Sequence, residues 1–180
     1  IHDDGTVTSI NSADVDGDGF PDLVFGHSDG PAIVYLADRE ASAADRFTTA
    51  LRHPLGAASD VQPDVAVQDH DSDVTTPPRI VVATNSGLTL YPNGYQSTPT
   101  TVGVGALNVA SVAVGPTDAT GKADIVLGIP QGLYVMPDAL DDTDPKASFD
   151  AFSMTTVDTA LTTPVTDVSW TGDLVGASGG

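Results

Sequence analysis

One sequence pattern recurs four times along the chain, and the spacing of these repeats limits the possible folds more than any other feature of the sequence. Each copy contains a strand-like segment, a polar loop and a short apolar segment, usually followed by another apolar segment after a turn. Equivalent residues of the short apolar segments are separated by 57, 45 and 49 residues, and they are Leu23, Ile80, Ile125 and Leu174. A period of about 50 residues is typical of propeller blades, each of which is one four-stranded sheet.

The segments around each loop have the patterns of antiparallel strands. Before the loops, alternating or nearly continuous apolar residues occupy 7–10, 65–67, 109–114 and 165–170. After the loops, the short apolar segments begin at 22, 79, 124 and 173, and third segments follow at 33–36, 88–91 and 133–136. Less regular fourth strands are expected within 47–51, 98–104 and 149–157. One helix-like stretch, 39–46, is expected to be an insertion between the third and fourth strands of the first copy.

These patterns predict an all-β fold, a partial β-propeller of about 3.5 four-stranded antiparallel blades. The first blade would occupy residues 1–57, the second 58–105 and the third 106–160, and residues 161–180 would begin a fourth. Because propellers close with about four to eight complete blades, we expect further blades or other protein chains to complete the ring. The opening Ile1-His2-Asp3 is neither an initiator methionine nor a signal peptide, which favours a processed chain or an excerpt.

The charge of the chain limits its partners. Six lysines and arginines stand against 25 acidic residues, 24 of them Asp, so the formal net charge is −19 at pH 7. Such a field repels nucleic-acid phosphates and anionic membrane surfaces, and it attracts divalent cations. No apolar run approaches the roughly 20 residues of a membrane span, and the chain has no cysteine. We therefore expect neither nucleic-acid binding nor membrane insertion.

The first loop, residues 14–22, has the pattern of a calcium site. Its carboxylates fall at loop positions 1, 3, 5 and 9, where they would repel one another without a cation. Gly19 at position 6 permits a sharp turn, and the carbonyl at position 7 adds a further hard oxygen. The sequence therefore predicts Ca²⁺ as the cofactor, with the ligands Asp14, Asp16, Asp18, the Phe20 carbonyl and Asp22.

An EF-hand opens in the same way but requires a bidentate Glu at position 12 and a helix on each side. Position 12 of this loop is Phe25, which lies in an apolar strand-like segment. The loop is therefore expected to join two strands of one sheet.

Residues 14–26, followed by Gly30 and the strand-like segment 33–36, resemble the FG-GAP or VCBS-type repeat. That family forms the β-propellers of integrin α subunits and occurs in many secreted proteins. The resemblance implies a propeller in which a calcium loop joins the first and second strands of a blade. It implies the same ligands, Asp14, Asp16, Asp18 and Asp22 with the Phe20 carbonyl. The repeat covers nearly the whole chain, but only the first copy has the complete loop.

The second copy departs from this pattern. Acids alternate at Asp69, Asp71 and Asp73, but no glycine stands at position 6 and Arg79 replaces the acid at position 9. We expect the Arg79 guanidinium to neutralise these carboxylates, and the alternative is that they bind a second ion.

The third and fourth copies lose most of the acids. The third keeps only Asp118 and Asp124 around Lys122, and the fourth shortens to a turn at 171–173. Neither has enough oxygen ligands for calcium, so neither is expected to bind a metal.

Two segments match the residue pattern of an enzyme motif but lack the flanking structure or residues that the motif requires. Residues 26–30 match the G-x-S-x-G nucleophile elbow, but a strand-like run follows where that motif requires a helix. Residues 115–122 have one residue too many for a phosphate-binding loop, and Ala123 stands where Ser or Thr would bind Mg²⁺. The four histidines form no i, i+4 pair and are expected in exposed loops. We therefore predict a non-enzymatic protein with no catalytic residues.

Together these features favour an extracellular, secreted or cell-surface, calcium-stabilised propeller segment that serves structure, adhesion or assembly. Its partners would be other protein chains or further blades within a larger assembly. Extracellular modules can use weak calcium sites, with Kd of about 10⁻⁴ to 10⁻³ M. The alternative is a carbohydrate-binding propeller, or the accessory domain of a secreted hydrolase, with glycans as partners.

Overall fold

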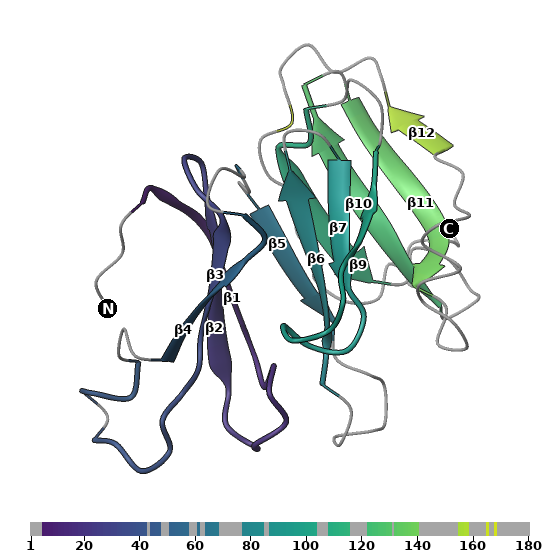
Figure 1. Ribbon diagram of the computed structural model, residues 1–180. Coiled ribbons are helices and arrows are strands. Elements are labelled where there is room, and N and C mark those ends of the chain that lie inside the picture. Colours follow the sequence, from purple (N-terminus) through teal and green to yellow (C-terminus); the bar gives the residue numbers. More distant parts are fainter. Residues whose placement is uncertain are drawn as a thin grey trace, which may run out of the picture.

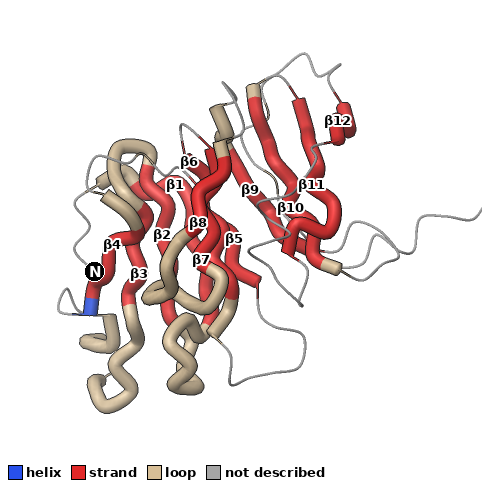
Figure 2. The backbone as a smooth tube through the Cα atoms, turned by 45° about the vertical axis from the view of Figure 1, so that its right-hand side comes forward, coloured by secondary structure: helices blue, strands red, loops and turns tan. Residues whose placement is uncertain are grey.

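The computed structural model describes residues 5–42, 44–47, 51–57, 61, 64–68, 77–84, 87–103, 108–115, 122–130, 132–140, 155–158, 165 and 168. In these residues the chain forms twelve strands in three four-stranded antiparallel sheets, and no α-helix occurs among them. Figure 1 shows the sheets one after another from left to right, and Figure 2 shows their strands joined by loops. The prediction of an all-β fold is confirmed.

Each sheet is a simple meander in which strands consecutive in sequence are neighbours. The first contains β1 (Val7–Ala13), β2 (Asp22–His27), β3 (Ala32–Tyr35) and β4 (Arg52–Leu55). The second contains β5 (Asp64–Gln68), β6 (Arg79–Thr84), β7 (Gly87–Tyr91) and β8 (Thr100–Val102). The third contains β9 (Ser111–Gly115), β10 (Ala123–Ile129), β11 (Gly132–Leu140) and β12 (Thr155–Asp158).

The three sheets share one pairing register, so equivalent residues can be assigned between them. Ser9 pairs with Gly26, Asp64 with Ala83 and Ser111 with Gly128, each at the same level of its sheet. One residue further along the first strands, the equivalent residues are Ile10, Val65 and Val112. At the other end of these hairpins the equivalent residues are Asp22, Arg79 and Asp124, which pair with Ala13, Gln68 and Gly115.

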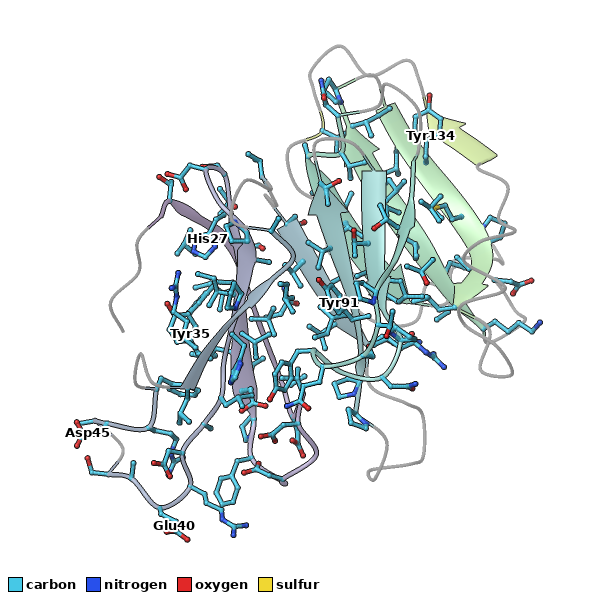
Figure 3. The ribbon with its side chains drawn as sticks, viewed as in Figure 1. His27, Tyr35, Glu40, Asp45, Tyr91 and Tyr134 are labelled. Atoms are coloured by element: carbon cyan, nitrogen blue, oxygen red, sulfur yellow. The ribbon has the colours of Figure 1, made fainter. Side chains whose placement is uncertain are left out.

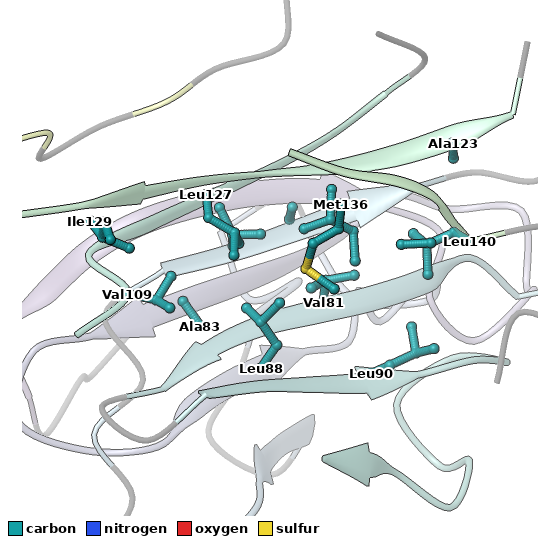
Figure 4. Close-up of a cluster of buried hydrophobic side chains, with 14 residues drawn as sticks. Val81, Ala83, Leu88, Leu90, Val109, Ala123, Leu127, Ile129, Met136 and Leu140 are labelled. Carbon is teal, nitrogen blue, oxygen red and sulfur yellow. The ribbon is translucent and has the colours of Figure 1, made fainter. Parts of the chain in front are cut away.

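The hydrophobic core lies between successive sheets. Because side chains alternate between the two faces of a strand, one face of the first sheet packs against the second sheet. Residues in this layer include Val24, Val34, Val65, Ile80 and Val82. The opposite face of the second sheet packs against the third sheet, as Figure 4 shows. Residues in that layer include Val81, Leu88, Leu90, Leu127 and Met136.

The first strands of the three sheets lie next to one another, since β5 contacts both β1 and β9. The sheets therefore stack with their first strands on one common side. In the described part of the chain, the three sheets do not close into a barrel or a ring.

Two sequence-based expectations for the first sheet were wrong. The helix-like stretch forms turns and bends at 39–42 and 44–46, because local polar side chains bind the backbone there. Asp38 Oδ1 accepts from Glu40 N at 3.0 Å, and Ser42 Oγ donates to Asp45 Oδ2 at 2.8 Å. The fourth strand is β4, an edge strand that tolerates Pro54, and it begins after the expected range 47–51, of which 48–50 lie outside the described residues.

The expected fourth blade cannot be compared with the structure. Of residues 161–180, only Val165 and Val168 are described, so its second strand lies outside the described residues. No helix in the described part of the chain is both long and apolar enough to cross a membrane.

Candidate metal site

The loop between β1 and β2 brings three carboxylates together. One oxygen each from Asp14, Asp16 and Asp18 lies within 4.8 Å of the other two. Among the described residues, this is the one group of three or more potential metal-ligating side chains. Such a group could hold a metal ion, because the oxygens converge on one small volume.

Backbone hydrogen bonds hold the loop in shape. Asp14 Oδ1 accepts from Gly17 N at 2.8 Å and from Asp18 N at 3.0 Å, and Asp14 Oδ2 accepts from Gly19 N at 2.7 Å. Further along, Asp18 Oδ1 accepts from Phe20 N at 2.9 Å. The loop therefore wraps around the Asp14 carboxylate at its centre.

The two glycines explain why the sequence can form this loop. Gly17 has φ of 79° and Gly19 has φ of 88°, and both angles lie in the left-handed region that residues with a Cβ rarely adopt. The sharp turn predicted at Gly19 is confirmed, and Gly17 makes a second one.

The electrostatics of the loop favour a cation. Burial raises the pKa of Asp16, and the negative charges of Asp18 and Asp14 raise it further, although a hydrogen bond from Asp18 N opposes the shift. Repulsion among the three carboxylates is thus built into the loop. A bound cation would remove it.

Asp22, the fourth predicted carboxylate ligand, is not part of this group and accepts hydrogen bonds from the backbone. It is 0% exposed, and its Oδ2 accepts from Val15 N at 2.9 Å while its Oδ1 accepts from Ala37 N at 2.7 Å. Burial raises the pKa of Asp22 to about 6, and the charges of Asp16 and Asp14 contribute. Asp22 therefore ties the loop to the chain after β3, and its role as a ligand stays a prediction.

Phe20 is positioned by two contacts. Its N–H binds Asp18 Oδ1, and the Arg46 guanidinium lies over its ring, 5.8 Å from the centroid. The Phe20 carbonyl as a ligand remains a prediction.

Sequence reasoning missed a structural role for the acid at this repeat position. Asp124 is equivalent to Asp22 and also 0% exposed, and its Oδ1 accepts from Asp138 N at 2.6 Å. Asp138 is equivalent to Ala37, because it lies two residues after Met136, the partner of Ile125, as Ala37 lies two residues after Tyr35, the partner of Leu23. Asp138 itself lies within the longer strand β11. The signal was present, since the third copy keeps this acid although it has lost the alternating carboxylates.

In the second sheet the equivalent residue is Arg79, as the sequence predicts. It is 1% exposed, and its Nη1 donates to Gln68 Oε1 at 3.2 Å and to the Leu140 carbonyl at 3.4 Å. Its predicted acidic partners, Asp69, Asp71 and Asp73, lie outside the described residues, as do Asp118 and 171–173.

The two enzyme-like segments and the histidines have structural explanations where they are described. Residues 26–30 run from β2 through a bend into β3, so the G-x-S-x-G letters form a hairpin rather than a nucleophile elbow. His27 is 1% exposed, with Nδ1 2.8 Å from the Pro31 carbonyl, and His53 packs on the Tyr95 ring at 4.9 Å. The expectation of exposed loop histidines was wrong for His27 and for His53, which is half-buried in β4. His2 and His70 lie outside the described residues.

Neither a family model nor a curated protein matches this chain. The function must therefore be inferred from the geometry and charge of the loop and from the arrangement of the sheets.

Proposed function

We propose that the protein is a calcium-binding β-propeller segment whose role is structural, in adhesion or assembly, and not enzymatic. The observation that carries this proposal is the convergence of the Asp14, Asp16 and Asp18 oxygens within 4.8 Å on a loop built around two left-handed glycines. Calcium is the favoured ion because it is a hard cation that takes carboxylate and carbonyl oxygens in a flexible geometry, and this loop supplies three carboxylates.

The sheet arrangement supports the propeller part of the proposal. Three meanders of equal strand number stack in sequence order, with β1, β5 and β9 adjacent along one side. Blades of a propeller have this relation. The resemblance of residues 14–36 to the FG-GAP repeat agrees with both the sheet order and the position of the loop.

An extracellular location suits this site. Only three side-chain carboxylates converge, and two of them, Asp16 and Asp18, are exposed to solvent. A site of this kind binds weakly, in the range of about 10⁻⁴ to 10⁻³ M that extracellular modules use. The alternative of carbohydrate binding gains no specific support from the described residues.

The test compares two charge-removing variants. Asp16→Asn removes one carboxylate of the group, whereas Glu40→Gln removes an exposed acid of the loop between β3 and β4 that does not belong to the group (Figure 3). Titration calorimetry should show one calcium bound by the wild type and by Glu40→Gln, with affinity reduced at least about tenfold in Asp16→Asn.

The same samples should differ in thermal stability. A ligand bound only by the native state adds about 2.7 kcal/mol at a hundredfold excess over Kd. Chelation should therefore lower the Tm of the wild type and of Glu40→Gln, and change that of Asp16→Asn little. Equal melting temperatures in calcium and in chelator for all three proteins would sink the proposal.

A further inference from the structure

One hydrogen bond recurs between the first strands of successive sheets. Val65 N donates to Ser9 Oγ at 3.2 Å, and Val112 N donates to Asp64 Oδ2 at 2.8 Å. The two acceptors are equivalent in the register, and so are the two donors. Each first strand therefore offers a side-chain acceptor to the backbone of the first strand in the next sheet.

The third sheet has the acceptor of this series without a donor. Ser111 is equivalent to Ser9 and Asp64, because it pairs with Gly128 as they pair with Gly26 and Ala83. Ser111 is 1% exposed, and within the described residues its Oγ has no hydrogen-bond partner. Buried polar groups normally have partners, so this position calls for one.

Val165 lies at the same place. A Cβ built on Gly128 would be 2.6 Å from Val165 Cγ1 and 2.4 Å from Ser111 Oγ, so the missing side chain leaves room for Val165. The face of the third sheet that points away from the second is thus already occupied at this point by a residue that follows β12.

The second sheet shows the same arrangement one step earlier. Ala83, the equivalent of Gly128, lies beside Val109 in the core between the second and third sheets (Figure 4). Val109 precedes Val112 by three residues, and Val165 precedes Val168 by three residues. Both segments also have the order Val, any residue, Ser or Asp, Val.

We propose that the outer face of the third sheet, at Ser111 and Gly128, is the docking site for the first strand of a fourth sheet. The chain beginning at Val165 supplies that strand, and the Val168 N–H donates to Ser111 Oγ once the strand is in register. Residues 166, 167, 169 and 170 lie outside the described residues, and the strand at 165–170 is a prediction from the sequence. The inference rests on the sheet stacking of the proposed function and does not involve calcium.

Hydrogen exchange at single amides tests the bond. The Val65 amide provides the reference, since its bond to Ser9 is present in the structure. In the wild type the Val168 amide should be protected to a similar degree as that of Val65. Ser111→Ala should speed exchange at Val168 about tenfold and leave Val65 unchanged. Ser9→Ala should leave Val168 unchanged and affect Val65 less, because the Val65 N–H also donates to Asp64 Oδ1 at 2.9 Å. An unprotected Val168 amide, or one indifferent to Ser111→Ala, overturns the proposal.

A disulfide tests the position of the strand independently. The chain has no cysteine, and a Cβ at Gly128 would lie 3.4 Å from Val165 Cβ, close to the usual spacing of about 3.8 Å. Gly128→Cys with Val165→Cys, in a Ser111→Ala background that removes the obstructing hydroxyl, should form an intramolecular disulfide. Gly30→Cys with Val165→Cys is the matched control, because Gly30 lies in the first sheet's hairpin with open space around it, and it should stay reduced.

Both measurements are made in calcium and in chelator at several protein concentrations. A disulfide between chains, or Val168 protection that rises with protein concentration, would assign the strand to a second copy and overturn the proposal. Because neither readout needs a bound ion, failure of calcium binding at Asp14–Asp18 is distinguishable from failure of this inference.

Discussion

Two buried aspartates hold the ends of their hairpins by accepting backbone hydrogen bonds. Asp22 and Asp124 are both 0% exposed. Asp22 accepts the N–H of Ala37 just after β3, and Asp124 accepts the N–H of Asp138 near the end of β11. The calcium pattern explained Asp22 as a ligand, and that explanation is incomplete. Its amide partner, Ala37, is 15 residues away, and a contact at that separation follows from the pairing of β2 with β3 rather than from local sequence.

We predict that Asp22 makes the stability of the metal-free protein depend on pH. Its pKa in the folded state is raised to about 6 from 3.8, mainly by burial. Between these values the native state binds a proton that the unfolded chain releases, so the free energy of unfolding should increase as pH falls from 7 to about 5. The contribution between pH 7 and pH 5 is about 1 kcal/mol.

Urea unfolding in chelator at pH 5 and pH 7 measures this effect. Asp22→Asn is the reference, because the Asn side chain does not titrate. This variant should be less stable than the wild type by about 1–3 kcal/mol, because the Asn NH₂ group must face a backbone N–H. With calcium bound the trend should be opposite, because protons compete with the ion. Identical pH dependence in both proteins without calcium would contradict the assignment.

The strand pattern predicted the elements better than the loops. The first three strands of each meander were predicted from the repeat, because alternation and turn residues are local signals. The edge strand β4 was missed because Arg52, His53 and Pro54 lack apolar alternation and are held by pairing with β3. The helix expected at 39–46 failed because Asp38 and Ser42 form local turns. The three-acid cluster was predicted by spacing alone, whereas the burial of Asp22 required the tertiary fold.

Arg79 connects the second sheet to the third, and its removal should loosen both. Its Nη1 donates to Gln68 within the second sheet and to the Leu140 carbonyl of β11. Arg79→Ala should lower the free energy of unfolding by about 1–3 kcal/mol, because buried acceptors lose their donor.

Arg79→Asp should be destabilised in chelator and partly restored by calcium, if the acids of the second loop then bind an ion. Calorimetry showing a second calcium bound by the unmutated chain would overturn the view that Arg79 replaces a metal there.

Gly87 permits the close approach of β7 to the end of β8. A Cβ at Gly87 would lie 2.2 Å from the Val102 carbonyl oxygen, which is backbone and cannot move aside. Gly87→Ala should therefore destabilise the protein by about 1–3 kcal/mol. Gly103→Ala, one residue beyond the clash, has nothing within 4 Å of its new Cβ and should change stability little. Chemical denaturation of the two variants checks this, and equal midpoints would contradict the packing of this hairpin.

At the scale of the whole molecule, the outer face of the first sheet differs in solvent exposure from the equivalent faces of the second and third sheets. Val65 and Val112 are 2% and 3% exposed because each packs against the preceding sheet, whereas the equivalent Ile10 is 62% exposed. In the described residues no sheet precedes the first one. Its register partner Phe25 and the neighbouring Ile33 are buried in a separate small cluster, so Ile10 is the exposed apolar residue of this face. An exposed apolar residue beside an unpaired sheet face attracts other chains.

We predict that the chain self-associates in solution through this face. Ile10→Lys should weaken association about tenfold, because it removes a contact of about 1.5 kcal/mol and adds a charge that must be desolvated. Gln96→Lys is the control, since it adds the same charge on an exposed turn after β7 and leaves Ile10 in place. Sedimentation velocity over a range of concentrations distinguishes the variants. If the wild type sediments as a monodisperse 18.3 kDa monomer at every concentration, the Ile10 face does not mediate association, because an uncovered stacking surface would make the sedimentation coefficient rise with concentration.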